Sequence, residues 1–259
     1  MNFTPEMIEK LRGARHMVVL TGAGVSQESG IPTFRDALTG LWERFDAEAL
    51  ATPQAFAADR DLVWGWYEWR RGRVLNCRPN AAHQAIARME RCLPKFSLLT
   101  QNVDDLHERA GSNVLHLHGS LHHPRCEQCG QNFEFPPGLP SEPEGGRRLT
   151  PPRCASCGGW IRPGVVWFGE ALAADTWRQA TEATQQCDVM FSVGTSSIVY
   201  PAAALPFAAA KRGACVIQVN PHPTDLDAVA DYTLCGKAGD FMPDLVAAAW
   251  PETRTGREA

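Results

Sequence analysis

The sequence lacks any run of apolar residues long enough to cross a membrane. A transmembrane helix needs about 18 or more apolar residues, and no stretch of that length occurs. The first residues lack the apolar segment of a secretory signal peptide, and they include acidic side chains, which argues against a transit peptide. We therefore expect no membrane partner and a cytoplasmic location.

Positive charge is also scarce. The chain has 259 residues, with 25 Lys and Arg against 29 Asp and Glu, and a formal net charge of −4. Proteins that bind nucleic acids usually present a basic stripe, and none is evident, so we expect no nucleic-acid partner. The length suits one sizeable domain with a small satellite. The sequence does not decide between a monomer and an oligomer.

The cysteines do not suggest a disulfide framework. Their number is odd, nine, and only four occur in Cys-x-x-Cys pairs. Such a pattern favours a reducing compartment in which some thiolates bind a metal. The five scattered cysteines are Cys77, Cys92, Cys187, Cys215 and Cys235.

Six short apolar runs, several rich in β-branched residues, indicate the strands of a buried parallel sheet. Helix-like stretches separate most of them, so we predict an α/β fold with a Rossmann-like doubly wound sheet. Ligands of such sheets gather at the carboxyl ends of the strands, where this sequence places Gly, Asn, Gln, His, Thr and Ser. The runs cover residues 16–20, 96–100, 114–117, 189–193, 215–219 and 232–235, and two of the helix-like stretches cover 81–91 and 103–110.

Two insertions interrupt this alternation. The first covers roughly residues 36–80, is rich in tryptophan and is predicted to be helical; the second covers roughly 122–163 and holds the cysteine pairs. Between those pairs, residues 135–146 are rich in Pro, Gly and Glu, which is typical of a mobile loop. We expect residues 1–259 to form a single domain that carries both additions.

The cysteine pairs have the spacing of zinc ligands. Cys126 and Cys129 form one pair, and Cys154 and Cys157 form the other. Two such pairs can surround one tetrahedral Zn²⁺ with four thiolates, which leaves no position for a water, so we predict one structural zinc ion. The alternatives are two accidental pairs of buried thiols, or a nucleic-acid-binding zinc ribbon, which the low basic content disfavours.

A glycine-rich turn, Thr21-Gly-Ala-Gly24, follows the first predicted strand. Glycines let the backbone approach a pyrophosphate, whose charge amide groups and a helix N-terminus can meet. The dinucleotide fingerprint requires a third glycine where this chain has Gln27, so the short match fits a plain strand-to-helix turn equally well.

A longer series of motifs is far more specific. Residues 22–36 read GAGVSQESGIPTFRD, and further motifs follow in order along the chain. Over about residues 15–240 the series resembles the signature of the sirtuin family of NAD-dependent protein-lysine deacylases. Gly164 is a departure, because many relatives carry a bulkier polar residue there. The further motifs are TQNVDDLH at 100–107, His118-Gly119, VVWFGE at 165–170, GTS at 194–196 and Val219-Asn220.

The resemblance implies that NAD binds as a co-substrate at the carboxyl edge of the sheet. The glycine turn would hold the pyrophosphate, and the next loop would close over NAD. The segment after the second strand would line the nicotinamide and ribose pocket, and later segments would hold the adenosine half. The residues implied, in that order, are Gly22, Ala23 and Gly24; Phe34 and Arg35; Gln101, Asn102, Val103 and Asp104; and Gly194, Thr195, Ser196, Asn220 and Ala238.

The resemblance also implies the chemistry. Nicotinamide leaves a pocket walled by Asn102 and Asp104 while the acyl oxygen attacks the ribose, and His118 then acts as the general base. The products are free lysine and O-acyl-ADP-ribose. Histidine suits this role because its ordinary pKa of ~6.5 lies near working pH, although a histidine after a strand is more often structural. His116 is the competing candidate, and His118 is preferred because it directly precedes the glycine of the motif.

The tryptophan-rich insertion contains a Tyr-x-x-Arg pair, Tyr67 and Arg70, which would share one face of a helix. The residue types alone suggest a packed tyrosine beside a solvated arginine. Sirtuins that prefer succinyl-, malonyl- or glutaryl-lysine resemble this chain here, which implies a guanidinium and a phenol that bind the acyl carboxylate. The residues expected to contact the substrate are Tyr67, Arg70, Ala51, Val166, Trp167 and Phe168.

The resulting expectation is a deacylase that uses NAD to remove succinyl, malonyl and acetyl groups from acyl-lysine proteins. Two alternatives remain, a protein mono-ADP-ribosyltransferase and a non-catalytic NAD-binding interaction module. The combination of Asn102, Asp104 and His118 speaks against the second, because a binding module has no need of a general base. A hydride-transfer dehydrogenase is disfavoured because NAD would be consumed and not reduced.

Overall fold

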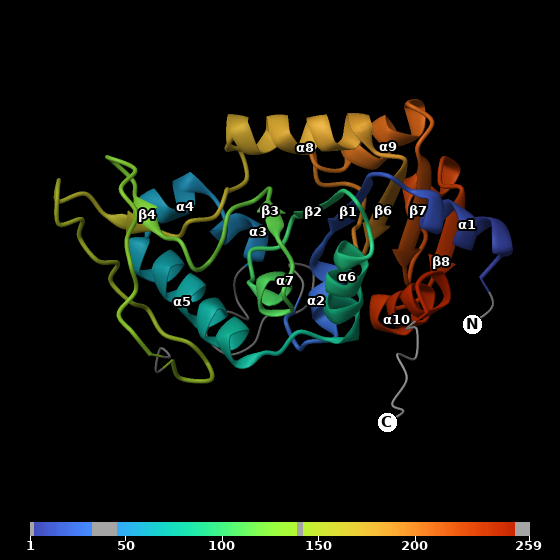
Figure 1. Cartoon of the computed structure of the whole chain (residues 1–259). Coiled ribbons are helices and arrows are strands. Elements are labelled where there is room, and N and C mark those ends of the chain that lie inside the picture. Colours follow the sequence, from blue (N-terminus) through green and yellow to red (C-terminus); the bar gives the residue numbers. More distant parts are fainter. Residues whose placement is uncertain (1–2, 33–45, 139–141, 252–259) are drawn as a thin grey trace, which may run out of the picture.

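A six-stranded parallel sheet forms the centre of the part that the computed structural model describes, residues 3–32, 46–138 and 142–251. Its strand order is β3-β2-β1-β6-β7-β8, which is the order of a dinucleotide-binding fold (Figure 1). Each strand coincides with one of the six predicted runs, so the predicted α/β class is confirmed. The strands are Met17–Thr21 (β1), Phe96–Thr100 (β2), Val114–His116 (β3), Val189–Val193 (β6), Cys215–Asn220 (β7) and Tyr232–Cys235 (β8).

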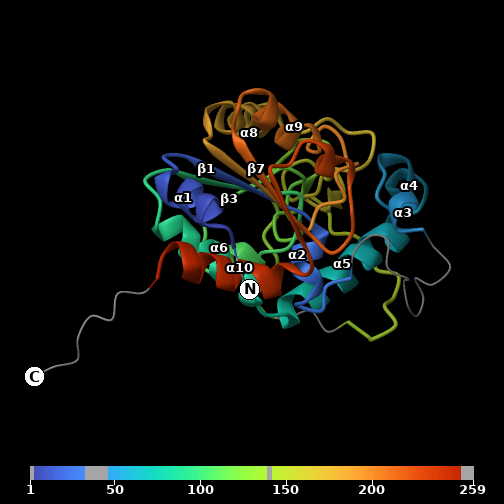
Figure 2. The same ribbon diagram turned by 90° about the vertical axis from the view of Figure 1, so that its right-hand side faces the viewer.

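Helices cover both faces of the sheet, as Figures 1 and 2 show from two directions. The segments α1 (Pro5–Gly13), α2 (Ala23–Gln27), α6 (Ala81–Arg91) and α10 (Ala238–Ala249) lie on one face, and α8 (Ala174–Gln186) and α9 (Ala204–Lys211) lie on the other. A short 3₁₀ segment covers Asp225–Ala228. Among the described helices, none has the length and apolar character that a membrane span requires.

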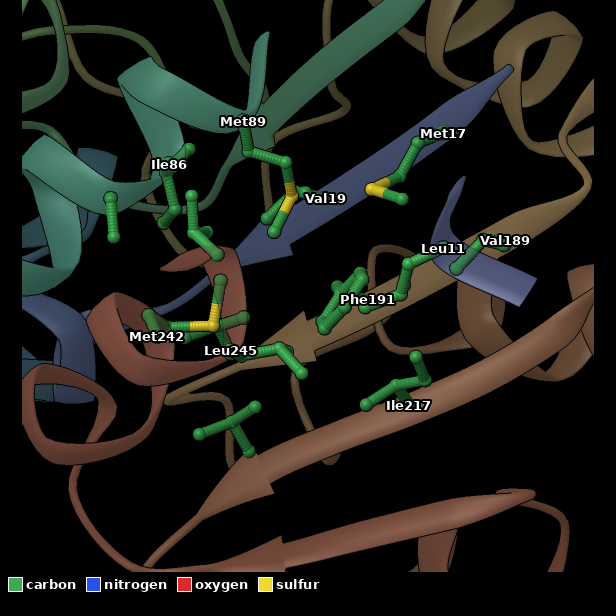
Figure 3. Packing of buried hydrophobic residues seen from close by; sticks show 14 of the residues in the cluster. Leu11, Met17, Val19, Ile86, Met89, Val189, Phe191, Ile217, Met242 and Leu245 are labelled. Carbon is green, nitrogen blue, oxygen red and sulfur yellow. The ribbon is translucent and has the colours of Figure 1, made fainter. Parts of the chain in front are cut away.

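The central strands are buried on both faces, which explains their continuous apolar sequence. Along β1, Met17 and Val19 enter the core beneath α6 and α10, whereas Val18 and Leu20 enter the core beneath α8 and α9. Figure 3 shows the first of these cores, where methionine and aliphatic side chains of the helices meet Phe191 of β6. This packing fixes the sheet, and the carboxyl ends of its parallel strands lie along one edge. The predicted functional residues come directly after several of these strand ends.

The helix predicted over residues 103–110 is shorter in the structure. It begins at Leu106 and ends at Arg109 (α7), because a carboxylate oxygen of Asp104 accepts the Leu106 amide at 3.1 Å and keeps the preceding residues in a loop. Gly111, with φ at +95°, ends this segment as expected. The polar residues after β2 therefore remain available to a site and are not wound into a helix.

A second core joins the two insertions beside the sheet. It unites α3 (Ala47–Leu50), α4 (Pro53–Ala58) and α5 (Arg60–Asn76) with a small antiparallel ribbon, β4 (Arg125–Cys126) and β5 (Ile161–Arg162). The predicted helical insertion and small cysteine-bearing module are thus both present. The insertion's expected beginning, residues 36–45, lies outside the described residues.

The segment between the cysteine pairs packs along α5 where the structure describes it past residue 141. The Trp69 indole donates to the Glu144 carbonyl at 2.9 Å, and the Leu149 amide donates to the Asp61 carbonyl at 2.9 Å. Gly65 permits the closest approach, because a Cβ atom there would lie 2.1 Å from the Arg147 carbonyl oxygen. Glu144 of the expected mobile loop thus contacts α5, as do Arg147 and Leu149 just beyond that loop, and the mobility itself stays a prediction.

Substituting Gly65 by Ala tests this contact. Alanine favours a helix by about 1 kcal/mol over glycine, but forcing an atom against backbone costs about 1–3 kcal/mol, so we expect a net loss of up to roughly 2 kcal/mol. Denaturant unfolding of the whole chain measures the change. Gly13→Ala is the control, because no atom lies within 4 Å of the new Cβ position. Equal stability of the two variants would show that the segment does not press on α5.

Candidate functional site

The site begins where the strand order reverses, between β1 and β6. The Gly22 amide donates to the Val193 carbonyl at 3.0 Å, and the Gly24 amide donates to the Gly194 carbonyl at 2.9 Å. A Cβ atom on Gly22 would lie 2.7 Å from the Gly194 oxygen, and one on Gly24 would lie 2.9 Å from the Gly194 Cα. These glycines are therefore required by the contact between the two turns, whatever ligand they also meet.

The other residues expected to hold NAD follow β6, end β7 or begin α10, and they differ in exposure. The Thr195 hydroxyl is buried and lies 2.8 Å from the Ser192 hydroxyl, whereas Ser196 is partly exposed. The Asn220 side chain donates to the His222 carbonyl at 2.8 Å, and Ala238 is the first residue of α10. Phe34 and Arg35 lie outside the described residues. The NAD-binding roles of all of these stay predictions.

Asn102 and Asp104 are brought together by a residue that the sequence analysis did not single out, Ser26. The Ser26 hydroxyl accepts from the Asn102 side-chain amide at 3.0 Å and donates to a carboxylate oxygen of Asp104 at 3.0 Å. Burial raises the pKa of Asp104, against the opposing effect of the hydrogen bonds from Leu106 and Ser26. Ser26 belongs to the quoted motif of residues 22–36, and its hydroxyl on an otherwise apolar turn was the available signal.

A group of uncharged polar side chains supports the loop after β2, which carries Asn102 and Asp104. The Thr100 hydroxyl accepts from the Asn102 backbone amide at 3.0 Å and from the Thr21 hydroxyl at 2.8 Å. The His107 Nε2 lies 3.0 Å from the Thr21 oxygen, and the His107 ring packs 4.7 Å from that of His83. Burial lowers the pKa of His83 to about 4 and that of His107 to about 3, so both rings are neutral at neutral pH.

His118, the predicted general base, has one ring nitrogen in a hydrogen bond and a lowered pKa. Its Nδ1 lies 3.0 Å from the Gln101 carbonyl oxygen, which can only accept, so Nδ1 carries the proton and Nε2 has a free lone pair. Burial lowers the pKa of His118, and the hydrogen bond to Gln101 opposes this in part. His116, the competing candidate, has both ring nitrogens in hydrogen bonds, to the Asn102 carbonyl and to Glu108.

The segment expected to bind the substrate runs directly beside His118. The Val166 amide donates to the His118 carbonyl at 2.8 Å. A Cβ on Gly119 would lie 2.2 Å from the Gly164 oxygen, and one on Gly164 would lie 1.8 Å from the His123 oxygen. The departure at Gly164 is thereby explained, since a bulkier residue would require the backbone near His123 to move.

The Tyr-x-x-Arg pair lies on α5, and both side chains are buried. Arg70 is only 8% exposed, so the solvated arginine suggested by residue types is wrong. The Tyr67 hydroxyl accepts from the Trp167 indole at 3.0 Å, which connects α5 to the substrate segment. The Ala51 carbonyl accepts from the Phe168 amide at 2.9 Å. The expected substrate residues therefore converge, with Phe168 the most exposed among them.

Two further residues that the sequence analysis did not single out hold Trp167 in place. Arg162 makes a two-pronged ion pair with Glu170 at 2.6 and 2.8 Å, and its guanidinium lies 3.5 Å from the centre of the Trp167 ring. Glu170 also accepts from the Trp167 amide at 2.9 Å. Trp167 is thus contacted at its backbone, its ring face and its indole N–H, and these three contacts fix its orientation.

The four paired cysteines converge as a tetrahedral zinc site requires. Their sulfur atoms all lie within 4.8 Å of one another, with 3.4 Å between Cys126 and Cys157 and 3.7 Å between Cys129 and Cys154. Bonds of ~2.3 Å from one Zn²⁺ place neighbouring sulfurs ~3.8 Å apart. Backbone amides, the one in Cys129 first, lower the pKa of Cys126 to about 7, which favours the thiolate. The cluster fits one zinc ion and lies in the small module, away from the strand ends (Figure 1).

Comparisons with known proteins agree with this geometry. The sequence profile of the Sir2 family matches residues 22–201. An NAD-dependent protein deacylase of Methylococcus capsulatus is 61% identical over 249 residues, which cover 96% of this chain and 98% of the relative. NAD-dependent protein deacylase 1 of Pseudomonas aeruginosa is 56% identical over 248 residues, 95% of this chain and 98% of the relative.

Solved structures of Sir2 proteins have the same fold as this chain. The crystal structure of a Sir2 homolog–NAD complex superposes with a TM-score of 0.87 at 47% identity, covering 96% of this chain and 94% of the other. A Sir2 bound to acetylated peptide superposes with a TM-score of 0.81 at 29% identity, covering 94% of this chain and 97% of the other.

Elemental analysis of freshly purified protein should find one zinc ion per chain. Substituting Cys154 by Ser should abolish zinc retention and lower the unfolding temperature, because structural zinc binding is coupled to folding. Cys92→Ser is the control, since that exposed thiol lies outside the cluster. A zinc-free parent protein, or full zinc content in the Cys154 variant, would contradict the assignment.

Proposed function

Because this chain belongs to the Sir2 family, the sirtuins, and is an NAD-dependent protein deacylase, we propose that it removes acyl groups that end in a carboxylate. Succinyl- and malonyl-lysine in proteins are the proposed substrates, with acetyl-lysine also accepted. The observation that carries the proposal is the burial of Tyr67 and Arg70 side by side on α5, next to the substrate segment.

The surroundings of Arg70 suit a carboxylate ligand. Its guanidinium is buried and lies 5.1 Å from the centre of the Trp66 ring, so a carboxylate that reached it would form a charge-assisted hydrogen bond largely shielded from water. Burial lowers the pKa of Arg70, while Tyr67 and the Asp104 carboxylate act in the opposite direction. The electrostatic effect of Asp104 on Arg70 supports the proposal that Arg70 lies near the nicotinamide pocket. An acyl chain that enters beside that pocket would present its terminal carboxylate to Arg70.

Tyr67 is suited to donate a hydrogen bond to such a carboxylate. Its oxygen already accepts from Trp167 at 3.0 Å, so its own proton is directed elsewhere. Burial raises the pKa of Tyr67 far above its usual range, so the phenol stays protonated. Ala51, bonded through its carbonyl to the Phe168 amide, contributes only a methyl group and leaves room for a longer acyl chain.

The proposed chemistry assigns one task to each element of the site. NAD, when bound, supplies a ribose carbon that loses nicotinamide and accepts the acyl oxygen. Asn102 and Asp104 would line the nicotinamide pocket, and the free Nε2 of His118 would take the proton of a ribose hydroxyl. Because the pKa of His118 is lowered from 6.5, the base stays deprotonated at neutral pH, and loss of activity through its protonation is expected only on the acid side.

Substituting His118 by Ala should lower the deacylation rate by ~10²–10⁴-fold, because the proton acceptor is lost. Formation of O-acyl-ADP-ribose, followed by mass spectrometry, measures the rate. Calorimetric titration with NAD and a circular dichroism spectrum are the controls, and both should match the parent. A rate within a few-fold of the parent would remove His118 from the mechanism.

Substituting Arg70 by Met should selectively weaken turnover of acidic acyl groups. A charge-assisted hydrogen bond contributes ~1.5–3 kcal/mol, so kcat/KM for a succinyl-lysine peptide should fall ~10- to 100-fold. Turnover of the same peptide with an acetyl group should change little. Arg70→Lys should restore the activity only in part, because an ammonium group cannot form the two-pronged contact.

The matched control for this experiment is Arg73→Met, which removes an exposed guanidinium one turn further along α5. Both activities should be unaffected by that change. An unchanged succinyl-to-acetyl ratio in Arg70→Met would refute the carboxylate clamp, because loss of a purely structural arginine lowers both activities together.

The proposal also includes the setting in which the enzyme works. We propose the cytoplasm, and the support is that none of the nine cysteines, all of which lie in the described residues, forms a disulfide, as is typical of a reducing compartment. The proposed partners are acyl-lysine proteins, which must bring an extended segment to the exposed side of the substrate segment at Phe168.

A further inference from the structure

His116, the last residue of β3, is hydrogen-bonded at both ring nitrogens. Its Nδ1 lies 3.0 Å from the Asn102 carbonyl oxygen, and its Nε2 lies 2.6 Å from a carboxylate oxygen of Glu108 on α7. A carbonyl oxygen and an ionised carboxylate oxygen can only accept hydrogen bonds. Both nitrogens must then carry protons, so the geometry describes an imidazolium ion, in contrast to the neutral ring of His118.

The two histidines hold successive carbonyl groups of one loop. His118 donates to the carbonyl of Gln101, and His116 donates to that of Asn102. Asn102 is also fixed at its amide by the Thr100 hydroxyl, at 3.0 Å, and at its side chain by Ser26. Among these hydrogen bonds of Asn102, the one from His116 has a charged donor. A charged donor makes a hydrogen bond stronger than a neutral one does.

We propose that His116 is a positioning residue for the nicotinamide step, held as an imidazolium by Glu108 so that it fixes the Asn102 backbone. The proposal rests on the role proposed for Asn102 and is independent of the acyl preference. His116 itself touches neither NAD nor the acyl-lysine in this role. Glu108 acts one step further back, because its carboxylate keeps the His116 ring charged and oriented.

The charges that face His116 determine at which pH the contact is lost. Burial alone would lower the pKa of His116, but the hydrogen bond and charge of Glu108 outweigh it, so the pKa is raised above 6.5, with the Asn102 carbonyl and Asp104 acting in the same direction. His107, the other titratable side chain facing the ring, is neutral. Below the raised pKa the His116 ring has two N–H groups and donates to both acceptors. As pH rises through that value the neutral ring keeps a single N–H, which the Glu108 carboxylate attracts more strongly than the Asn102 carbonyl, so the contact with Asn102 is lost.

The pH dependence of nicotinamide exchange tests the proposal. Labelled nicotinamide and an acetyl-lysine peptide are supplied with NAD, and incorporation of label into NAD is followed across roughly pH 6–9. The acetyl group carries no carboxylate, so failure of the acyl clamp cannot affect the result. For the parent, exchange should fall on the alkaline side as His116 loses its proton.

Glu108→Gln should move this alkaline fall to lower pH by about one unit, since the ring loses the charge that keeps it protonated. Exchange should be near the parental rate at the acid end and ~3- to 10-fold lower at the alkaline end. His116→Gln keeps a hydrogen-bond donor that does not titrate, so its exchange should be uniformly lowered and should no longer fall at alkaline pH.

Glu90→Gln is the matched control, because Glu90 accepts hydrogen bonds from the backbone and side chain of Asn113 just before β3 and has no contact with His116. Its profile should match that of the parent. The proposal is overturned if Glu108→Gln lowers exchange by the same factor at every pH, as a merely structural residue would. It is equally overturned if the alkaline fall persists unchanged in His116→Gln.

Discussion

The site depends on one backbone contact, the one between the turn after β1 and the turn after β6. Gly22 and Gly24 lie so close to Gly194 that a single additional methyl group would separate them. This contact joins the two halves of the sheet at the point where their connections diverge, and the ligand crevice of a doubly wound sheet lies there. The neighbouring loop after β2 is tied to the same place, since Ser26 on α2 holds both Asn102 and Asp104.

The histidines near the site show how burial and neighbouring charges give one residue type different protonation states. His83 and His107 are withdrawn from water without a compensating carboxylate and are neutral structural groups. His118 is likewise neutral but keeps a free nitrogen toward the site. His116, beside Glu108, is charged. Two histidines only two residues apart at the end of β3 therefore have pKa values shifted in opposite directions.

Much of the fold and part of the site could be predicted from the sequence. Strands that are buried on both faces have continuous apolar sequences, so the order of strands and helices could be predicted. The spacing of the cysteines indicated the metal cluster. Contacts between segments far apart in the sequence could not be predicted. Ser26, the Glu108–His116 pair and the Arg162–Glu170 pair involve ordinary polar residues, whose partners are set by tertiary packing and leave no periodic pattern. The burial of Arg70 depended in the same way on the second core beside the sheet.

The Val166 amide donates a hydrogen bond to the His118 carbonyl, so the backbone positions of these two segments depend on each other. A shift of residues 164–168 would displace His118, the proposed base, because a Cβ atom on Gly119 or Gly164 would already collide with neighbouring backbone. Helix α5 contacts the same region through a side chain, since the Tyr67 hydroxyl accepts from the Trp167 indole. If α5 selects the acyl group as we propose, substitutions on its surface would change selectivity without moving the backbone at His118, which makes that helix the natural target for redesign.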